Sequence, residues 1–426
     1  MEMKKYKLSE IAYFVEEKIS SDRLTLNEYI TTDCLLQNKK GRTVATNLPP
    51  QPCGLTKFKK GDVLIGNIRP YLKKLWFADS DGGCSLDVLV LRAKKIEESS
   101  FLYSLLMQDD FFDFVMKAPT GTKMPRGDKN HILSYPCFDI QNKIKVGNFI
   151  KLLDNKIALN HRINAKLEAM AKRLYDYWFV QFDYPDKNGK PYKTSGGKMV
   201  WNEVLKREIP EGWEVKNIFE ASDVLYGYPY ATEPFDEDNL DFSKKPYKIV
   251  RIRDIKSNTF SAKTTEVVDE KYKTMRNDLL VGMDGYFHMN FWFRNDDFIN
   301  QRIVRLRKTL ISTLILYFQI SPFIKFKEEM AKGSTVGHLS DKDLKQLFVA
   351  IPNDNSISDR FDSILNMITK NNSEIQKLTD LRDRLLPLLM NGQVEVGTNN
   401  SSEFCNAKLG KQATACDMNG QVEVEG

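Results

Sequence analysis

Two stretches of the chain place an apolar residue at every third or fourth position for about eight turns. They cover residues 150–178 and 361–389, each position lying 211 residues from its counterpart, and this periodicity predicts two amphipathic helices. Asn160 and Asn371 interrupt the two stripes at the same step. Because a buried Asn in a coiled-coil seam fixes register at some cost in stability, we predict that the helices pair as a coiled-coil spacer. The expected seam residues are Ile150, Leu153, Ile157, Asn160, Leu167, Leu174, Phe361, Ile364, Ile368, Asn371, Leu378 and Leu385.

Shorter matches between the two halves continue outside the helices. Residues 60–66 (KGDVLIG) resemble residues 276–282 (RNDLLVG), and residues 117–123 resemble residues 329–335. Several matches in the same order and at nearly the same offset indicate an internal duplication. Each half then consists of β-rich sequence, a short helix, a loop with Gly and Thr, and the long helix.

The predicted fold class is therefore α+β, with two tandem globular α/β domains, a two-helix coiled-coil spacer and a pseudo-two-fold internal repeat. A chain of 426 residues is too long for one ordinary core, so its length also favours two domains with connectors. The expected boundaries are a first globular domain at 1–140, a first spacer helix at 141–182, a linker at 183–208, a second globular domain at 209–355, a second spacer helix at 356–391 and a disordered tail at 392–426.

Composition favours a cytoplasmic globular protein. The hydrophobic fraction is 42%, and the apolar stretches are too short and too polar for a transmembrane helix. The amino-terminal sequence MEMKKYKLSE lacks the apolar core of a signal peptide. Six cysteines without a CxxC motif and four scattered histidines give no metal-ligand spacing, so we expect reduced thiols and no bound metal.

The net charge of +6 is modest, but the basic residues are unevenly distributed. Residues 57–74 and residues 244–256 each hold six Lys or Arg against one Asp, with aromatic residues among them. Either stretch alone is equally well interpreted as a solvated strand edge, but one in each half favours phosphate binding. The glycine loops at 120–129 and 332–338 add hydroxyls and cations that suit phosphates and base edges, although a tight turn explains each loop nearly as well.

Recognisable catalytic motifs are lacking. The sequence has no GxxxxGK[ST] phosphate loop, and no strand–GxG–helix opening for a nucleotide cofactor. Its four histidines have no Cys or Ser neighbour arranged as a nucleophile. These observations favour a binding protein without a cofactor of its own over an enzyme.

Four segments resemble the DNA-specificity subunits of type I restriction–modification enzymes. They are GDVLIGNIRPYLKKLWFA at 61–78, LEAMAKRLYDYWFVQFDYP at 167–185 with IPEGWEV at 209–215, KGSTVGHLSDKDLKQLFVAIP at 332–352 and EIQKLTDLRDRLLPLLMNGQ at 374–393. The resemblance implies two target-recognition domains, each reading one half of a split, asymmetric DNA sequence. It also implies that the two helices pair antiparallel and dock two methyltransferase subunits, with restriction/translocase subunits added outside.

The same resemblance implies that this chain is non-catalytic and that S-adenosylmethionine binds to the partner methyltransferase. Residues 397–426, in which the sequence MNGQVEV recurs, extend beyond the usual end of such chains, so nothing is transferred to them. A coiled-coil interaction scaffold without DNA readout is the main alternative, and an enzyme fused to one recognition half is the weaker one. The candidate DNA-binding residues are Lys57, Lys59, Lys60, Arg69, Tyr71, Lys73, Lys74, Thr122, Lys123, Arg126, Lys129, Lys244, Lys245, Lys248, Arg251, Arg253, Tyr286, Ser334, Thr335 and His338.

Overall fold

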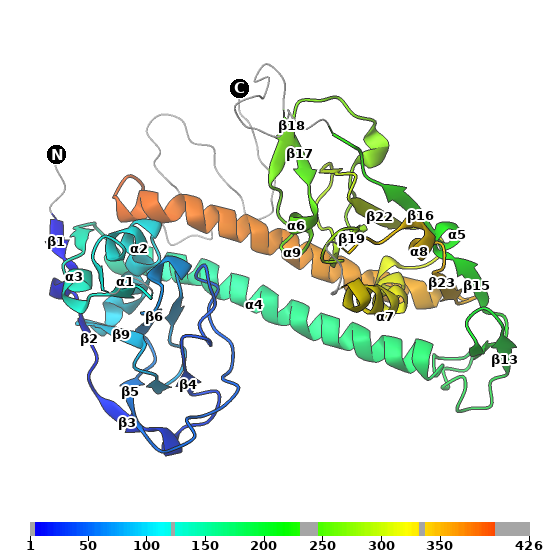
Figure 1. The fold of residues 1–426 in the computed structure, drawn as a ribbon. Helices are drawn as coiled ribbons and strands as arrows, with labels where there is room; N and C mark the ends of the chain where they lie inside the picture. The colour runs from blue at the N-terminus through cyan, green and yellow to red at the C-terminus, as the bar shows by residue number, and fades with distance from the viewer. Residues whose placement is uncertain (1–4, 121–123, 231–245, 332–336, 397–426) are drawn as a thin grey trace. The chain divides into compact units, whose positions relative to one another are not determined.

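The computed structural model describes residues 5–120, 124–230, 246–331 and 337–396 (Figure 1). The chain divides into two compact units. The first consists of Met1–Ile157 with Leu378–Gly426, and the second consists of Ala158–Lys377. Each unit therefore contains one globular domain and one part of each long helix.

The first unit is built on a four-stranded sheet in the order β2-β9-β6-β7. A second sheet, in the order β3-β5-β8-β4, and a short pair of β1 with β12 complete its strand framework, and β10 pairs with β11. The strands are β1 (Lys5–Lys7), β2 (Ala12–Phe14), β3 (Lys18–Ser20), β4 (Tyr29–Ile30), β5 (Gly54–Phe58), β6 (Val63–Gly66), β7 (Leu75–Phe77), β8 (Gly82–Cys84), β9 (Val88–Ala93), β10 (Pro119–Thr120), β11 (Arg126–Gly127) and β12 (Pro136–Phe138). The short helices are α1 (Ser99–Leu106), α2 (Asp109–Val115) and α3 (Lys129–Leu133).

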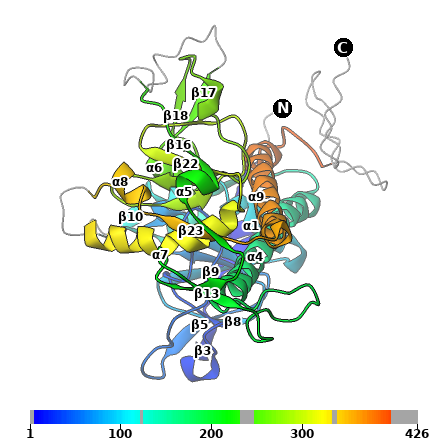
Figure 2. The same cartoon turned by 90° about the vertical axis from the view of Figure 1, so that its right-hand side faces the viewer.

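The second unit repeats this plan with a sheet in the order β16-β22-β19-β20 and a short pair of β15 with β23. A three-stranded sheet, β18-β17-β21, takes the place of the second sheet of the first unit. The strands are β15 (Glu214–Asn217), β16 (Ser222–Tyr226), β17 (Tyr247–Val250), β18 (Ala262–Thr264), β19 (Leu279–Gly282), β20 (Met289–Phe291), β21 (Phe298–Ile299), β22 (Ile303–Lys308) and β23 (Phe348–Ile351). The helices are α5 (Ile218–Ala221), α6 (Ile252–Ile255), α7 (Thr313–Ala331) and α8 (Asp341–Leu344), and α7 packs against β22 and β23 (Figure 2).

A buried ion pair occupies the same place in both units. In the first, Arg92 on β9 donates to the carboxylate of Asp62, with Nε 2.7 Å from Oδ1. In the second, Arg307 on β22 makes the same contact with Asp278 at 2.8 Å. Both carboxylates are almost fully buried, and each also accepts a hydrogen bond from the backbone three residues earlier. The shared topology and the shared ion pair confirm the predicted internal repeat.

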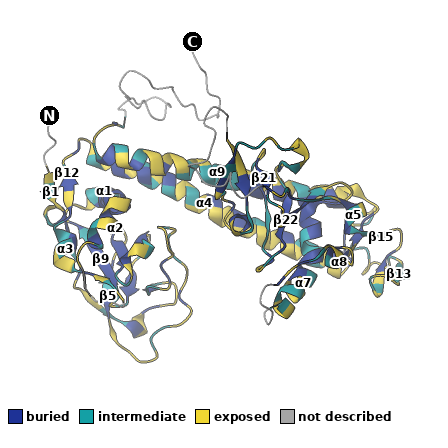
Figure 3. Cartoon of the chain, turned by 45° about the horizontal axis from the view of Figure 1, so that its top comes forward, coloured by how far each residue is buried: buried dark blue, intermediate teal, exposed yellow. Residues whose placement is uncertain are grey.

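The two predicted spacer helices are α4 (Lys143–Tyr175), which continues as a π-helical turn at Asp176–Val180, and α9 (Asn355–Met390). Buried and exposed residues alternate along both helices, as an amphipathic stripe requires (Figure 3). Within the second unit, Asn164 is buried and exchanges hydrogen bonds with Asn371 and Asn372 of α9, at 2.9 and 2.8 Å.

The remaining contacts of the seam run in the antiparallel sense. Asn160 donates to Glu374 at 3.1 Å in the second unit, and Arg382 pairs with Asp154 at 2.8 Å in the first. Residue numbers thus rise along one helix as they fall along the other. Of the expected seam residues, Ile150, Leu153, Asn160, Phe361, Ile364 and Ile368 are buried, whereas Ile157, Leu167, Leu174, Asn371, Leu378 and Leu385 are half-buried.

The segments that sequence alone treats as linker and tail are partly ordered. Residues 183–208 lead into a hairpin of β13 (Met199–Asn202) and β14 (Arg207–Pro210), and the backbone and hydroxyl of Thr194 both donate to Asp183. Val394, just after α9, is buried in the core of the first unit. Residues 397–426 lie outside the described residues. Across the described residues, no helix has the length and apolar character needed to cross a membrane.

Asp343 in the second unit should make stability depend on pH. Burial acts to raise its pKa, but hydrogen bonds from Lys327 and Ser340 outweigh burial and lower the pKa to about 2. Because this value lies below the unfolded pKa of about 3.9, the ionised carboxylate stabilises the fold above about pH 4, and this contribution is lost as the pH falls toward 2. We expect Asp343→Asn to lower the free energy of unfolding by about 2 kcal/mol at pH 7 and by much less near pH 2. Urea titrations at both pH values measure this, and an equal loss at both would contradict it.

Candidate nucleic-acid interface

Three chain segments meet at the ends of the two inner strands, β6 and β9, of the main sheet in the first unit. They are the turn that follows β6, the residue before β9, and strand β11. The backbone N–H of Arg69 donates to Pro125 O at 2.9 Å, and that of Asn67 donates to Asp87 O at 2.9 Å. Gly127 N–H donates to the Asn67 side chain at 3.0 Å. The structure therefore brings together two of the predicted segments, around Arg69 and around Gly127, which are far apart in sequence.

The side chains at this junction are charged and accessible. Arg126 Nη2 lies 3.1 Å from Asp87 Oδ1, and each side chain is more than two-fifths exposed. Tyr71 follows on the same turn and is half exposed. Arg69 has a backbone φ of 51°, a left-handed conformation that non-glycine residues rarely adopt. We call Arg69, Asp87 and Arg126 the first turn cluster.

The second unit contains the same junction. Gly285 N–H donates to Gly337 O at 2.9 Å, and Met283 N–H donates to Arg302 O at 3.0 Å. Leu339 N–H donates to Met283 O at 2.7 Å. The first two bonds repeat backbone bonds of the first unit at offsets of 212 to 216 residues, and the third joins equivalent residues but ends on a backbone carbonyl instead of the Asn67 side chain. Gly285 also has a positive φ of 69°, at the position equivalent to Arg69.

Different side chains occupy this second junction. Asp284 is flanked by two basic groups, because His338 Nδ1 lies 2.6 Å from its Oδ1 and Arg302 Nε lies 3.2 Å from its Oδ2. Tyr286 is two-thirds exposed and stacks on His288. We call Asp284, Arg302 and His338 the second turn cluster. Two junctions with one backbone geometry and different polar side chains are suited to binding two related but different polar surfaces.

Some lysines of the first basic stretch, residues 57–74, are accessible, whereas others are paired within the first unit. Lys59 and Lys60 are exposed, and Lys57 on β5 is half-buried. Lys73 instead pairs with Asp109 at 2.8 Å, and Lys74 donates to the backbone O of Thr32. These two lysines therefore already have partners in the first unit, and only part of the stretch faces solvent.

Asp109 receives two cations at once. Lys39 Nζ and Lys73 Nζ each lie 2.8 Å from the same carboxylate oxygen. Burial acts to raise the pKa of Asp109, but the hydrogen bonds from the two lysines outweigh burial and lower it. The contacts tie the segment around Lys73 to the start of α2, and sequence alone gave no sign of them.

In the second basic stretch and near it, cationic side chains lie over aromatic rings. Lys248 Nζ lies 4.4 Å from the centre of the Phe260 ring, and Arg294, which sequence reasoning missed, lies 4.9 Å from the rings of Trp292 and Phe293. Arg251 donates to the Ser261 hydroxyl at 3.0 Å, and its pKa is lowered by burial. Such cation–ring contacts hold long side chains in place at the surface.

Two of the remaining candidate DNA-binding residues lie at the surface. Arg253 is exposed, and Lys129 is exposed with its ammonium 5.5 Å from the Phe14 ring. Six predicted residues lie outside the part of the chain that the structure describes, and their assignments remain predictions. They are Thr122, Lys123, Lys244, Lys245, Ser334 and Thr335.

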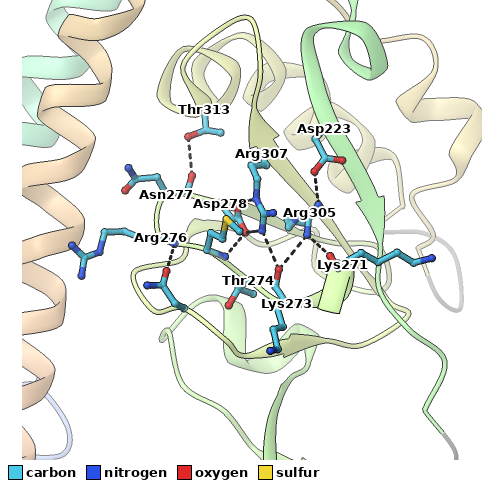
Figure 4. Close-up of polar contacts among 12 residues, drawn as sticks. Asp223, Lys271, Lys273, Thr274, Arg276, Asn277, Asp278, Arg305, Arg307 and Thr313 are labelled. Atoms are coloured by element: carbon cyan, nitrogen blue, oxygen red, sulfur yellow. Dashed lines mark hydrogen bonds and ion pairs between the residues drawn. The ribbon is translucent and has the colours of Figure 1, made fainter. Parts of the chain in front are cut away.

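Arg305 and Arg307 on β22 fix the backbone of residues 271–273 to the main sheet of the second unit (Figure 4). Arg305 is buried and donates to the backbone O of Lys271 at 2.6 Å and of Lys273 at 3.2 Å. It also donates to Asp223, and Arg307 donates to Lys273 O at 3.0 Å. Burial lowers the pKa of Arg305. The only sign of this network in the sequence is the alternation of Arg with apolar residues at 303–308.

Helix α4 and the π-helical turn that continues it also carry apolar residues that do not belong to the seam. Leu159, Ile163, Met170 and Tyr177 are each about two-fifths exposed in the second unit. Their spacing of four and seven residues places them on one face of the helix. We call these four residues the outer stripe.

Comparison with known proteins relates the chain to one family. Residues 210–380 match the type I restriction modification DNA specificity domain. The chain is 24% identical to the type I restriction enzyme HindI specificity subunit of Haemophilus influenzae, over 92% of this chain and 99% of that protein. It is 22% identical to the MjaIX specificity subunit of Methanocaldococcus jannaschii, over 84% and 83% of the two chains.

A solved structure supports the fold. The S subunit of a type I restriction–modification system from M. genitalium superimposes with a TM-score of 0.54 at 16% identity, over 92% of this chain and 96% of that one. At this identity the likeness concerns the fold alone. Together with the matching domain at residues 210–380, the comparisons confirm that this chain resembles the specificity subunits of type I restriction–modification systems along nearly its whole length.

Proposed function

We propose that this chain is a sequence-specific DNA-binding subunit in which each globular domain reads one half of a bipartite, asymmetric target. The observation that carries the proposal is the pair of turn clusters. One backbone geometry recurs in each unit, which suits two domains that bind one kind of ligand. The side chains differ between the clusters, so the two half-sites should have different sequences.

Phosphate contacts would position each domain on the duplex. Lysine and arginine side chains that neutralise phosphates release counterions, which makes binding strong and dependent on salt. The accessible candidates are Lys59 and Lys60 in the first unit and Lys248 and Arg253 in the second. Phosphate contacts carry no sequence information, so the turn clusters would supply the base contacts.

Methyltransferase subunits would dock on the spacer helices. The seam of α4 already faces α9, yet the outer stripe leaves a second apolar face of α4 exposed. An apolar helical face at this spacing suits a helix from a partner protein. S-adenosylmethionine and the chemical step would then belong to that partner, with restriction subunits added to the assembly, and this chain would be non-catalytic.

The length of the helices would set the gap between the half-sites. Helix α4 has 33 residues, which corresponds to about 50 Å at about 1.5 Å per residue. Two half-sites one helical turn apart are separated by roughly 34–36 Å along B-DNA. A helix of this length is therefore sufficient to space two domains by about one turn of the duplex.

Selection from a random DNA library tests the proposal with the chain assembled with its methyltransferase partner. We expect enrichment of one two-part motif with a fixed unread gap, and binding that weakens steeply as salt rises. The matched control is the methyltransferase partner without this chain, which should enrich no such motif. Stable assembly without any enriched sequence would contradict DNA readout and favour the scaffold alternative.

A further inference from the structure

Three positions around each junction correspond between the two units. Ile68 corresponds to Asp284, since each forms an isolated β-bridge, the first with Arg126 and the second with His338. Asp87 corresponds to Arg302, because each directly precedes the central strand of the main sheet. The chain therefore presents Ile, Asp and Arg in the first unit where it presents Asp, Arg and His in the second.

Each set includes one carboxylate in contact with a basic side chain. Asp87 pairs with Arg126, and Asp284 pairs with both Arg302 and His338. Asp87, Arg126, Arg302 and His338 are each more than two-fifths exposed and Asp284 is about one-quarter exposed, so these solvent-accessible ion pairs contribute little to the stability of the fold. Retaining an acidic group on a surface that would meet phosphates is also electrostatically unfavourable for binding. Neither stability nor general DNA affinity explains these carboxylates.

Orientation of the basic side chain does explain them. An arginine reads a base edge by two parallel hydrogen bonds, which require its planar guanidinium group to be held at a fixed angle. An unrestrained arginine instead reaches phosphates, and such contacts do not distinguish one sequence from another. A neighbouring carboxylate that accepts one N–H of the guanidinium group restricts that freedom.

On the basis of the proposed function, we infer that Asp87 and Asp284 are specificity-determining positioning residues. Asp87 orients Arg126 toward a base edge in one half-site, and Asp284 orients Arg302 and His338 toward a base edge in the other. Neither aspartate was among the residues selected from sequence, because each becomes conspicuous only when three distant segments meet.

A double-mutant cycle with a sequence readout tests this role. The variants are Asp87→Asn, Arg126→Ala and the double variant, each in the complex with the methyltransferase partner, with the preferred DNA motif determined for each. We expect Asp87→Asn to reduce discrimination about tenfold at one position of one half-site, the position that Arg126→Ala also relaxes. The double variant should relax that position no further than Arg126→Ala alone, because Asp87 acts through Arg126.

Matched controls separate this role from a structural one. Asp79→Asn removes an exposed acidic partner of Arg42 in the same unit, and Glu270→Gln removes the exposed partner of Lys273 in the second unit. Both should leave the motif unchanged, whereas Asp284→Asn should relax the other half-site only. Thermal unfolding should be unaltered in all of these variants.

Three results would overturn the inference while the wild-type motif is intact. These are an unchanged motif in Asp87→Asn and Asp284→Asn, relaxation of both half-sites by one variant, and effects that add fully in the double variant. A wild-type complex that selects no two-part motif would instead refute the proposed function itself, so the two failures are distinguishable.

Discussion

Replacing Arg382 with Met should destabilise the first unit by about 3–5 kcal/mol. Arg382 Nη1 lies 2.8 Å from Asp154 Oδ1, and both side chains are only 11% exposed. Methionine fills much of the same volume but leaves the Asp154 carboxylate buried without its cation. Tyr103 lies buried beside Asp154, and its pKa is raised first by burial and then by the Asp154 charge. Urea denaturation, monitored by amide hydrogen exchange in the first unit, measures the loss of stability.

Two further variants make this prediction specific. Asp154→Leu with Arg382→Met removes both charges, and we expect it to recover most of the lost stability, since an apolar pair replaces a buried ion pair at little net cost. Arg384→Met changes an exposed arginine on the same helix and should alter stability by less than about 0.5 kcal/mol. If all three variants lost the same amount, the explanation based on an uncompensated buried charge would be wrong.

Inserting seven residues into each long helix should lengthen the unread gap in the DNA target. Insertions between Ile157 and Ala158 and between Lys377 and Leu378 preserve the seam, since seven residues are two turns of a coiled coil. They lie between the Asp154–Arg382 pair and the Asn160–Glu374 pair. Each helix gains about 10 Å, which corresponds to at most about three base pairs.

The half-site sequences should stay the same in this variant, because no residue of either globular domain changes. Mapping the methylated motif measures both quantities at once. An insertion in α4 alone is the control, and it should break the pairing of the seam and abolish assembly. A double insertion that methylates the original gap would show that the helices do not set the spacing.

The sequence was most informative where a pattern repeats. The apolar period identified both long helices, and the offset between KGDVLIG and RNDLLVG indicated the duplication that the two sheets confirm. The end of the second helix was less predictable. The period favoured Leu385 as a seam residue, but Leu386 and Leu389 are the more deeply buried. Pro387 lies inside this last part of α9, where the helix also packs on the core of the first unit.

Contacts between distant segments could not be predicted. Asp87 and Arg126 lie far apart in the sequence, and their pairing depends on the register that sets β11 beside the turn after β6. Lys73 was selected for phosphate contact because it lies in a basic stretch; its ion pair with Asp109 could not be read from the sequence, and the phosphate contact stays a prediction. Charge density along the chain indicates a kind of partner, but burial and pairing decide which side chains remain accessible.

Mapping adenine methylation in cells that express this chain with its methyltransferase partner tests the central claim most directly. The account predicts one asymmetric two-part motif with a fixed unread gap, which disappears when this chain is omitted and changes in only one half when one turn cluster is altered. Methylation that is the same with and without the chain, in cells where the complex is stably assembled, would contradict it.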